Sequence, residues 1–208
     1  MPAEPAPQFV VVLDVEGVLT PEIWIAVADR FGADELRRTT KDEPDYAKLM
    51  QGRIDTLAGL GLGLSDIQGV IAQLEPLDGA KDFLDRLRSV TQVVLLSDTF
   101  EEFIGPLMAK LGFPTILCHR LQVVDDRIVG FVPRIENQKM AAVHGFQAMN
   151  YRVVAAGDSF NDLNMIDAAD AGFLFRSPPA IVAQRSDLAA FETYDELFCA
   201  LTQVINAS

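Results

Sequence analysis

The stretch from Phe9 to Leu19, FVVVLDVEGVL, decides the fold. Its first five residues are apolar and mostly β-branched, which predicts a buried strand over residues 9–13. Asp14-Val15-Glu16-Gly17 follows, so two carboxyl groups stand at the end of this strand, where glycine lets the chain turn. Similar apolar runs lie at Val93 to Leu96, Val153 to Ala156 and Gly172 to Phe175. Several of the segments between these runs have apolar residues at helical spacing. This alternation predicts an α/β fold with a mostly parallel sheet and helices on both faces.

The block that follows the first strand has a different pattern. Between Gly17 and about Pro76, apolar residues repeat with helical spacing, at Ile23, Trp24, Val27 and Phe31 and again at Ile67, Val70, Ile71 and Leu74. We expect a helical cap over residues 17–76, inserted into an α/β catalytic core made of residues 1–16 and 77–208. The glycine-rich run 59–63 follows no strand, so we interpret it as a turn between cap helices. Leu121 to Arg134 predicts a β-hairpin beside the core.

The composition limits the classes of function. The chain has 208 residues, of which 50% are hydrophobic, enough for one well-buried core. Its formal charge of −13 disfavours nucleic-acid and membrane-surface partners, because their phosphates are repelled. No apolar segment approaches the ~20 residues that span a bilayer. The two cysteines lack metal-type spacing, and the N-terminal tail over residues 1–7 lacks the apolar stretch of a signal peptide. Both observations predict a cytoplasmic protein.

Each of the first three apolar runs ends in a polar cluster. Asp14-Val15-Glu16-Gly17 ends the first, Ser97-Asp98-Thr99 the second and Gly157-Asp158-Ser159 the third. Ligands of open α/β sheets bind just beyond the carboxyl ends of the strands. We therefore expect these clusters to converge on one site.

The first cluster has the residue types for phosphoryl transfer. An aspartate at the end of a buried strand can attack phosphorus as a nucleophile, and Asp14 is our candidate. Glu16 is the candidate general acid, which protonates the leaving alkoxide and later deprotonates the attacking water or alcohol. Two polar residues that merely end a strand remain the structural alternative.

Ser97 and Lys139 supply groups that bind phosphate. The Ser97 hydroxyl and the backbone N–H groups after it can hold a phosphate oxygen. Lys139 stands at the start of a predicted helix, where its ammonium can neutralise the transferring phosphoryl group. The alternatives are an ordinary turn serine and a solvated surface lysine.

Asp158 completes the acidic residues expected of a magnesium site. Mg²⁺ prefers hard oxygen ligands, and we expect it to be bound by Asp14, Asp158 and the backbone carbonyl of Glu16. Asn161 and Asp162 follow at a helix start. They either orient the ligands of the metal or cap the helix.

The chain resembles the haloacid dehalogenase superfamily over nearly its whole length. The residues that match the motifs of that superfamily are, in chain order, Asp14 with Glu16, Ser97, Lys139, and Asp158 with Asp162. Within that superfamily the chain resembles the phosphoserine phosphatase branch and, more closely, its bifunctional phosphoserine phosphatase/homoserine phosphotransferases. The supporting segments are Leu13 to Leu19, Pro21 to Trp24, Leu96 to Phe100, Leu111 to Thr115, Leu117 to His119, and Tyr151 to Ser159. Most relatives carry aspartate at position 16, and many phosphoserine phosphatases carry glycine at positions 98 and 159. At all three positions the chain is similar to the bifunctional enzymes.

The resemblance implies a Rossmann-like core, Mg²⁺ as cofactor and an aspartyl-phosphate intermediate. It also implies phosphoserine as the small phosphomonoester substrate, homoserine as an acceptor and a homodimer, although no sequence feature defines an interface. Glu22 would bind the ammonium of phosphoserine and Arg53 its carboxylate. Around the phosphate, the resemblance implies substrate contacts by Ser97, Asp98, Lys139 and Asn161.

Three other functions remain open, one of which is a purely structural interaction module that would tolerate the loss of Mg²⁺. A phosphatase of another small phosphomonoester, such as a sugar phosphate or nucleotide, would use the same core without needing Arg53. A non-catalytic phospholigand-binding protein would keep the fold, since a fold does not fix an activity. His119 and His144 have no partner spacing and are assigned no role, and Trp24 is interpreted as a core residue of the cap.

Overall fold

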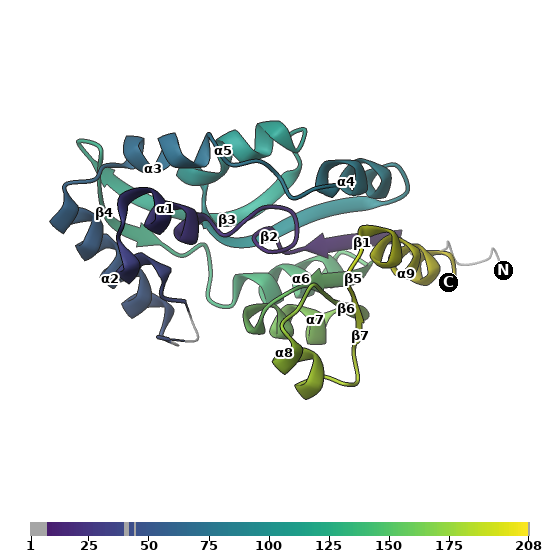
Figure 1. Cartoon of the computed structure of the whole chain (residues 1–208). Helices are drawn as coiled ribbons and strands as arrows, with labels where there is room; N and C mark the ends of the chain where they lie inside the picture. The colour runs from purple at the N-terminus through teal and green to yellow at the C-terminus, as the bar shows by residue number, and fades with distance from the viewer. Residues whose placement is uncertain (1–7, 40–41, 44, 208) are drawn as a thin grey trace.

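One sheet organises the chain. The computed structural model describes residues 8–39, 42–43 and 45–207; the predicted N-terminal tail lies outside them (Figure 1). Within these residues, seven strands form a sheet in the order β4-β3-β2-β1-β5-β6-β7. The strands are β1 Gln8–Leu13, β2 Gln92–Phe100, β3 Thr115–Val124, β4 Arg127–Val132, β5 Tyr151–Gly157, β6 Ala171–Phe175 and β7 Ala189–Phe191. Neighbours pair in parallel except β3 with β4, so the predicted fold class is confirmed.

The strand β2 is longer than the sequence predicts. It continues through Ser97, Asp98 and Thr99, which we expected to lie beyond the strand. Its parallel pairing with β3 runs to Leu96 and resumes only at Phe100. The polar residues therefore occupy an irregular segment between two paired positions, which frees their backbone groups from the sheet.

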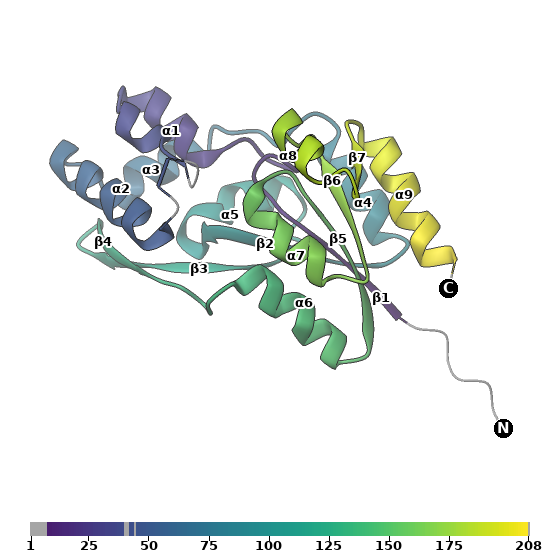
Figure 2. The ribbon, with the colours of Figure 1, turned by 90° about the horizontal axis from the view of Figure 1, so that it is seen from below.

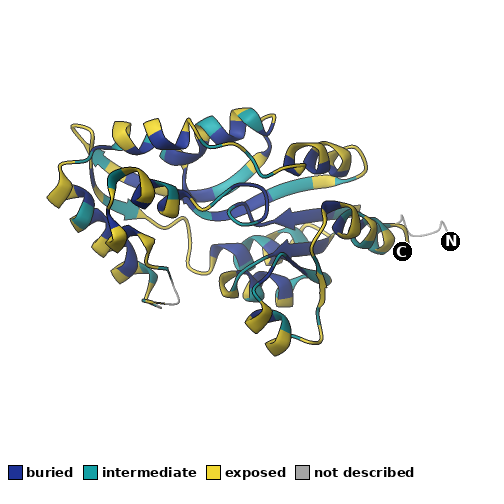
Figure 3. Cartoon of the chain, in the orientation of Figure 1, coloured by how far each residue is buried: buried dark blue, intermediate teal, exposed yellow. Residues whose placement is uncertain are grey.

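Helices cover both faces of the sheet because the strands alternate their apolar side chains between the faces. Val11 and Leu13 of β1 face α4 (Ala80–Arg88), α5 (Glu101–Lys110) and α9 (Tyr194–Asn206). Val10 and Val12 face α6 (Gln138–Ala148), α7 (Leu163–Ala168) and α8 (Pro179–Gln184). Figure 3 shows the buried residues on the strands and on the sheet-facing sides of the helices.

Among the described residues, four helical segments lie between β1 and α4, in the block where the sequence predicts a cap. They are α1 (Ile23–Phe31), the 3₁₀ helix η1 (Asp34–Arg37), α2 (Tyr46–Leu60) and α3 (Leu64–Ile71). Both views place α1, α2 and α3 with the β3–β4 hairpin at one end of the molecule, away from α9 (Figure 1, Figure 2). Their apolar residues join those above β1 in one hydrophobic core. The division of the chain at residues 17 and 76 stays a prediction.

The glycine-rich run joins cap helices, as predicted, although Gly59 belongs to α2 itself. Gly61 ends α2 in the left-handed region (φ 70°), which glycine adopts without strain. Gly63 precedes α3, where a Cβ would collide with the Asp126 carboxylate. Asp126 lies in the hairpin turn and accepts hydrogen bonds from the N–H (2.9 Å) and hydroxyl (2.6 Å) of Ser65. The predicted hairpin is thus confirmed, and its turn holds the start of α3.

The described residues contain no helix with both the length and the apolar character needed to cross a membrane.

Candidate active site

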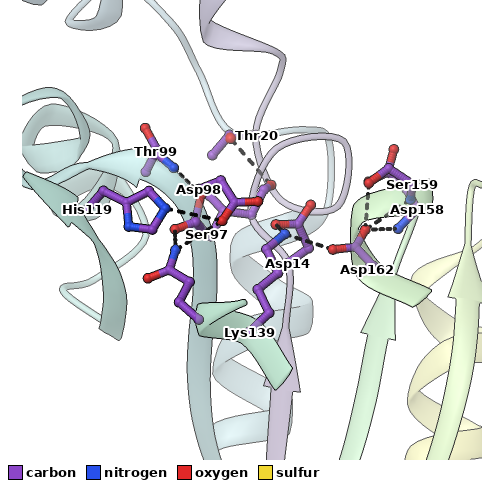
Figure 4. Close-up of polar contacts among 12 residues, drawn as sticks. Asp14, Thr20, Ser97, Asp98, Thr99, His119, Lys139, Asp158, Ser159 and Asp162 are labelled. Atoms are coloured by element: carbon purple, nitrogen blue, oxygen red, sulfur yellow. Dashed lines mark hydrogen bonds and ion pairs between the residues drawn. The ribbon is translucent and has the colours of Figure 1, made fainter. Parts of the chain in front are cut away.

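A buried ion pair forms the centre of the site. Asp14 directly follows β1, and its N–H donates to the carbonyl of Ala156 (3.1 Å) on the neighbouring strand. Lys139, in the first turn of α6, donates from Nζ to Asp14 Oδ1 and to Asp162 Oδ1, each at 2.7 Å. Lys139 is 6% exposed, so it is not the surface lysine of the structural alternative. Figure 4 shows Lys139 reaching between the two carboxylates.

The site carries more negative than positive charge. Burial and then the nearby Asp162 raise the pKa of Asp14, although Lys139 opposes this. Burial likewise opposes the charge of Lys139, but Asp14 and Asp162 outweigh it and raise the pKa of the ammonium. Asp158 has its pKa raised to about 7 by burial, Asp162 and Glu22. One ammonium does not balance these carboxylates, so the arrangement favours an additional cation.

Asp162 holds the loop after β5 in place. Its Oδ2 accepts hydrogen bonds from the N–H groups of Asp158 (3.0 Å) and Ser159 (2.9 Å) and from the Ser159 hydroxyl (2.9 Å). Since Oδ1 accepts from Lys139, both oxygens already have donors. The sequence left two roles open for Asp162, helix capping and orientation of the metal ligands. One carboxylate can serve both, because it caps the 3₁₀ helix η2 (Phe160–Asp162) and orients the site.

The acidic residues fit a magnesium ion. Oxygen atoms of Asp14, Asp158 and Asp162 lie within 4.8 Å of one another, and hard carboxylate oxygens are the ligands that Mg²⁺ prefers. Gly17 keeps this space open, because a Cβ there would lie 2.6 Å from Asp158 Oδ2. Its φ of 79° also favours glycine. The donors of Asp162 make Asp14 and Asp158 the better metal ligands, while the role of the Glu16 carbonyl stays a prediction.

Glu16 has the properties of a general acid. Its Oε2 accepts a hydrogen bond from the N–H of Ile23 (3.0 Å) at the start of α1, which fixes the side chain between core and cap. Burial, followed by the nearby Glu22, raises the pKa of Glu16 to about 8. A carboxyl group with that pKa is mostly protonated at neutral pH and can donate a proton.

The irregular segment of β2 is held by side chains from other elements. Ser97 Oγ accepts from the N–H of Thr99 (3.2 Å), and the Ser97 carbonyl accepts from Gln138 Nε2 (2.5 Å). Gln138 Nε2 also donates to Asp98 Oδ1 (3.1 Å), and His119 Nε2 lies 3.5 Å from the same atom. Burial opposes the charge of Asp98, but Lys139, His119 and Gln138 outweigh it and lower its pKa to about 2. His119, to which the sequence assigned no role, therefore supports this segment.

The cap contributes a buried arginine. Arg53 is 8% exposed, and its guanidinium carbon lies 4.6 Å from the centroid of the Trp24 ring. Its Nη2 donates to the carbonyl of Arg38 (2.8 Å), whereas its buried Nε has no partner among the described residues. Burial lowers the pKa of Arg53. Trp24 is buried as predicted and, in addition, carries Arg53 at the edge of the site.

These side chains surround one cavity of about 180 Å³. Apart from Asp162, which lies behind the wall, every site residue predicted from the sequence lines it: Asp14, Glu16, Glu22, Arg53, Ser97, Asp98, Lys139, Asp158 and Asn161. Sequence reasoning missed other lining residues, including Tyr46, Leu49 and Phe160. Asp45 before Tyr46 is a helix-capping residue type and could have located the start of α2, but no pattern indicated that its first residue faces the site.

The site combines an aspartate after a central strand, a buried lysine and an acidic loop beneath a helical cap. These features define a class of capped α/β hydrolases. The chain belongs to the haloacid dehalogenase-like hydrolase family, whose model matches residues 64–167. The predicted family is thereby confirmed.

Individual relatives have names that indicate a narrower group. The chain is 52% identical to the phosphoserine phosphatase ThrH of Pseudomonas aeruginosa over 186 residues, which cover 89% of this chain and 91% of the relative. A substrate-bound phosphoserine phosphatase structure superposes with a TM-score of 0.75 at 20% identity, covering 98% of this chain and 99% of the other. Another, described as a phospho-aspartyl intermediate analogue of phosphoserine phosphatase, has a TM-score of 0.74 at 19% identity and covers 90% and 95%. Both structures support the fold.

Proposed function

We propose that the chain is a Mg²⁺-dependent phosphoserine phosphatase that works through an aspartyl-phosphate on Asp14 and also transfers the phosphoryl group to homoserine. The observation that carries the proposal is the Lys139–Asp14 contact of 2.7 Å on the floor of a cavity whose cap side is lined by Arg53 and Glu22. The 52% identity to a phosphoserine phosphatase supports the substrate.

In the first half of the reaction, an Asp14 oxygen attacks phosphorus and the bond to the serine oxygen breaks. Glu16, neutral because of its raised pKa, gives its proton to the departing alkoxide, so that serine leaves as an alcohol. Lys139 and the N–H groups of the Ser97 segment balance charge on the phosphoryl oxygens.

In the second half, water attacks the phosphorus of the aspartyl-phosphate. The Glu16 carboxylate takes the proton of this water, and the bond to Asp14 breaks. Phosphate leaves, and both side chains return to their initial states. The proton that Glu16 donates in the first half is thus recovered in the second.

Asp14, Asp158 and the Glu16 carbonyl would hold Mg²⁺. When bound, the cation offsets the mutual repulsion of the carboxylates and the phosphate. This role is consistent with the raised pKa values of Asp14 and Asp158, since burial and then the neighbouring Asp162 disfavour the charged forms that a bound cation would favour.

Arg53 and Glu22 would recognise the amino-acid part of the substrate. A guanidinium binds a carboxylate with paired hydrogen bonds, and Arg53 lines the cavity and has a buried Nε without a partner among the described residues. Glu22 offers the opposite charge to the ammonium. Homoserine carries the same two groups with one more methylene, so its hydroxyl can replace water as acceptor while Glu16 takes its proton.

The test measures serine and phosphate release from phosphoserine with Mg²⁺, with and without homoserine, while phosphohomoserine is followed. We expect phosphohomoserine to form at the expense of free phosphate. Phosphate release that homoserine leaves unchanged would reduce the function to a phosphatase. Without serine release, turnover of a sugar phosphate or nucleotide would favour the alternative substrate class, and no turnover across such a panel would favour a non-catalytic binding protein. The homodimer and the cytoplasmic location stay predictions from the sequence.

A further inference from the structure

Tyr46 is a cap residue fixed against the core. It begins α2, whose N-cap Asp45 accepts hydrogen bonds from the N–H groups of Ala47 (3.0 Å) and Lys48 (3.2 Å). The Tyr46 hydroxyl donates to the backbone carbonyl of Asp98 (2.8 Å). Its ring meets Phe131 of β4 edge to face, with the centroids 5.7 Å apart. The ring is therefore held both at its hydroxyl end and along its edge.

Tyr46 lies between two cavities. One is the site of about 180 Å³ that contains Asp14, and the other is a larger neighbouring cavity of about 560 Å³. Five residues line both: Tyr46, Asp98, Lys139, Phe160 and Asn161. Among these shared residues, Tyr46 alone comes from the cap, and the others come from the core. Removing its ring would join the two spaces directly beside the candidate phosphate site.

The larger cavity suits an apolar group better than a phosphate. Its lining includes Phe131, Pro133, Ile135 and Met140, and its acidic residues are Asp45, Asp98 and Glu136. Its basic side chains already have acidic partners, because Lys139 is bound to Asp14 and Asp162 and His119 Nε2 lies 3.5 Å from Asp98 Oδ1. A phosphate would be repelled there, whereas an aryl or alkyl group would find apolar contacts.

We infer that the Tyr46 ring determines the specificity of the site. By separating the two cavities, it excludes phosphomonoesters with bulky apolar leaving groups, such as aryl phosphates, from the position beside Asp14. This inference rests on the proposed phosphatase activity and adds the residue that limits the size of its substrate.

The test compares kcat/KM for para-nitrophenyl phosphate with kcat/KM for phosphoserine in the wild type, Tyr46→Ala and Tyr46→Phe. We use the ratio because a general loss of activity cancels from it. Tyr46→Ala should raise the ratio about tenfold or more, since a pocket that gains room for an apolar group changes selectivity by this amount. Tyr46→Phe keeps the ring and should leave the ratio near that of the wild type.

Two further variants identify the cause. Asn164 is exposed and lines only the larger cavity, so Asn164→Trp added to Tyr46→Ala should refill the space and reverse the gain. Tyr151→Ala is the matched control, because Tyr151 begins β5 at the end of the strand away from Gly157; it should not move the ratio. Since Tyr46 is half-buried in a helix turn that Asp45 caps, we expect its variants to fold, and thermal unfolding checks this.

An unchanged ratio in folded Tyr46→Ala, or an equal gain in Tyr46→Phe, would overturn the inference while leaving the phosphoserine activity of the wild type intact. Should Tyr46→Ala fail to fold, Tyr46→Leu replaces it with the same expected direction. A wild type that hydrolyses neither substrate would remove the proposed function together with the inference.

Discussion

The core and cap sides of the cavity are built differently. On the core side, Lys139 bridges Asp14 and Asp162, and Asp162 also accepts three hydrogen bonds from Asp158 and Ser159. On the cap side, Arg53 is buried on Trp24 and leaves its Nε unpartnered among the described residues. The groups of the proposed chemistry are thus positioned before a ligand arrives, whereas the arginine proposed to recognise the substrate has one donor without a partner among the described residues.

This difference separates two requirements. Transition-state stabilisation needs donors and charges that do not reorganise during the reaction, which the interlocked core supplies. Discrimination needs groups that lose a favourable contact when the wrong ligand binds, and we propose that the incompletely paired Arg53 is such a group. Substitutions on the core side should therefore impair turnover or folding, and those on the cap side should change which substrate is used.

Asp14→Asn should have the largest effect. The amide keeps the shape of the side chain but cannot form the phosphoenzyme, so turnover of phosphoserine should fall by at least about 10³-fold. Because burial and the neighbouring acids raise the pKa of Asp14, its charge opposes folding near neutral pH, and the variant should remain folded. The measurement is kcat together with trapping of the phosphoenzyme.

Asp82→Asn, at an exposed position of α4, is the control and should retain full activity. Full turnover by Asp14→Asn would contradict the nucleophile assignment and with it the core side of the comparison.

Asp162→Ala tests whether the core site is interlocked. Asp162 is fully buried, and the variant leaves Lys139 with one carboxylate and removes the acceptor for two N–H groups and a hydroxyl. Breaking a buried charged pair typically costs about 3–5 kcal/mol, so the free energy of unfolding should drop by about that amount. Urea unfolding without Mg²⁺ measures it. A loss of activity at unchanged stability would instead make Asp162 a metal ligand.

Arg53→Ala tests the cap side. Loss of a charge-assisted hydrogen bond to the substrate carboxylate should lower kcat/KM for phosphoserine about tenfold to 100-fold, mainly through KM. Phosphoethanolamine, which lacks that carboxylate, should be hydrolysed equally by the variant and the wild type. Michaelis–Menten kinetics on both substrates distinguish the two effects.

Arg38→Ala is the matched control, because Arg38 is exposed and contacts Arg53 through its backbone carbonyl, which the substitution keeps. If Arg53→Ala impaired both substrates alike, Arg53 would support the structure of the cap rather than recognise a carboxylate.

The same difference explains what the sequence could predict. Asp14 and Asp158 directly follow strands, so the rule that ligands bind beyond the carboxyl ends of strands brought them together correctly. Lys139 begins a helix, and its residue type and place in the order of motifs indicated its role. Tyr46 and Phe131 meet through the packing of α2 on a hairpin some 80 residues later, and no local pattern encodes that contact. Likewise, the irregular path of Ser97 to Thr99 depends on Gln138 and His119, which lie on other elements.

Asp98 lies where core and cap meet, and its charge should give the smallest effect. Its pKa is lowered to about 2, below the ordinary value of 3.8, so the folded protein binds a proton there less readily than the unfolded chain does. Its contribution to stability is therefore present above about pH 4 and is lost as the pH falls towards 2. Because a third of the side chain is exposed, we expect no more than about 1 kcal/mol.

Urea unfolding of the wild type and Asp98→Asn between pH 2 and pH 6 isolates this contribution, because the other carboxyl groups titrate in both proteins. The difference in unfolding free energy should be constant above pH 4 and shrink at lower pH. The variant keeps the backbone carbonyl that Tyr46 binds, so the cap contact should survive. A difference that stays constant down to pH 2 would mean that Gln138 and His119 hold the segment by hydrogen bonds to a neutral side chain equally well. The charge of Asp98 would then serve the ligand rather than the fold, as we propose for Arg53.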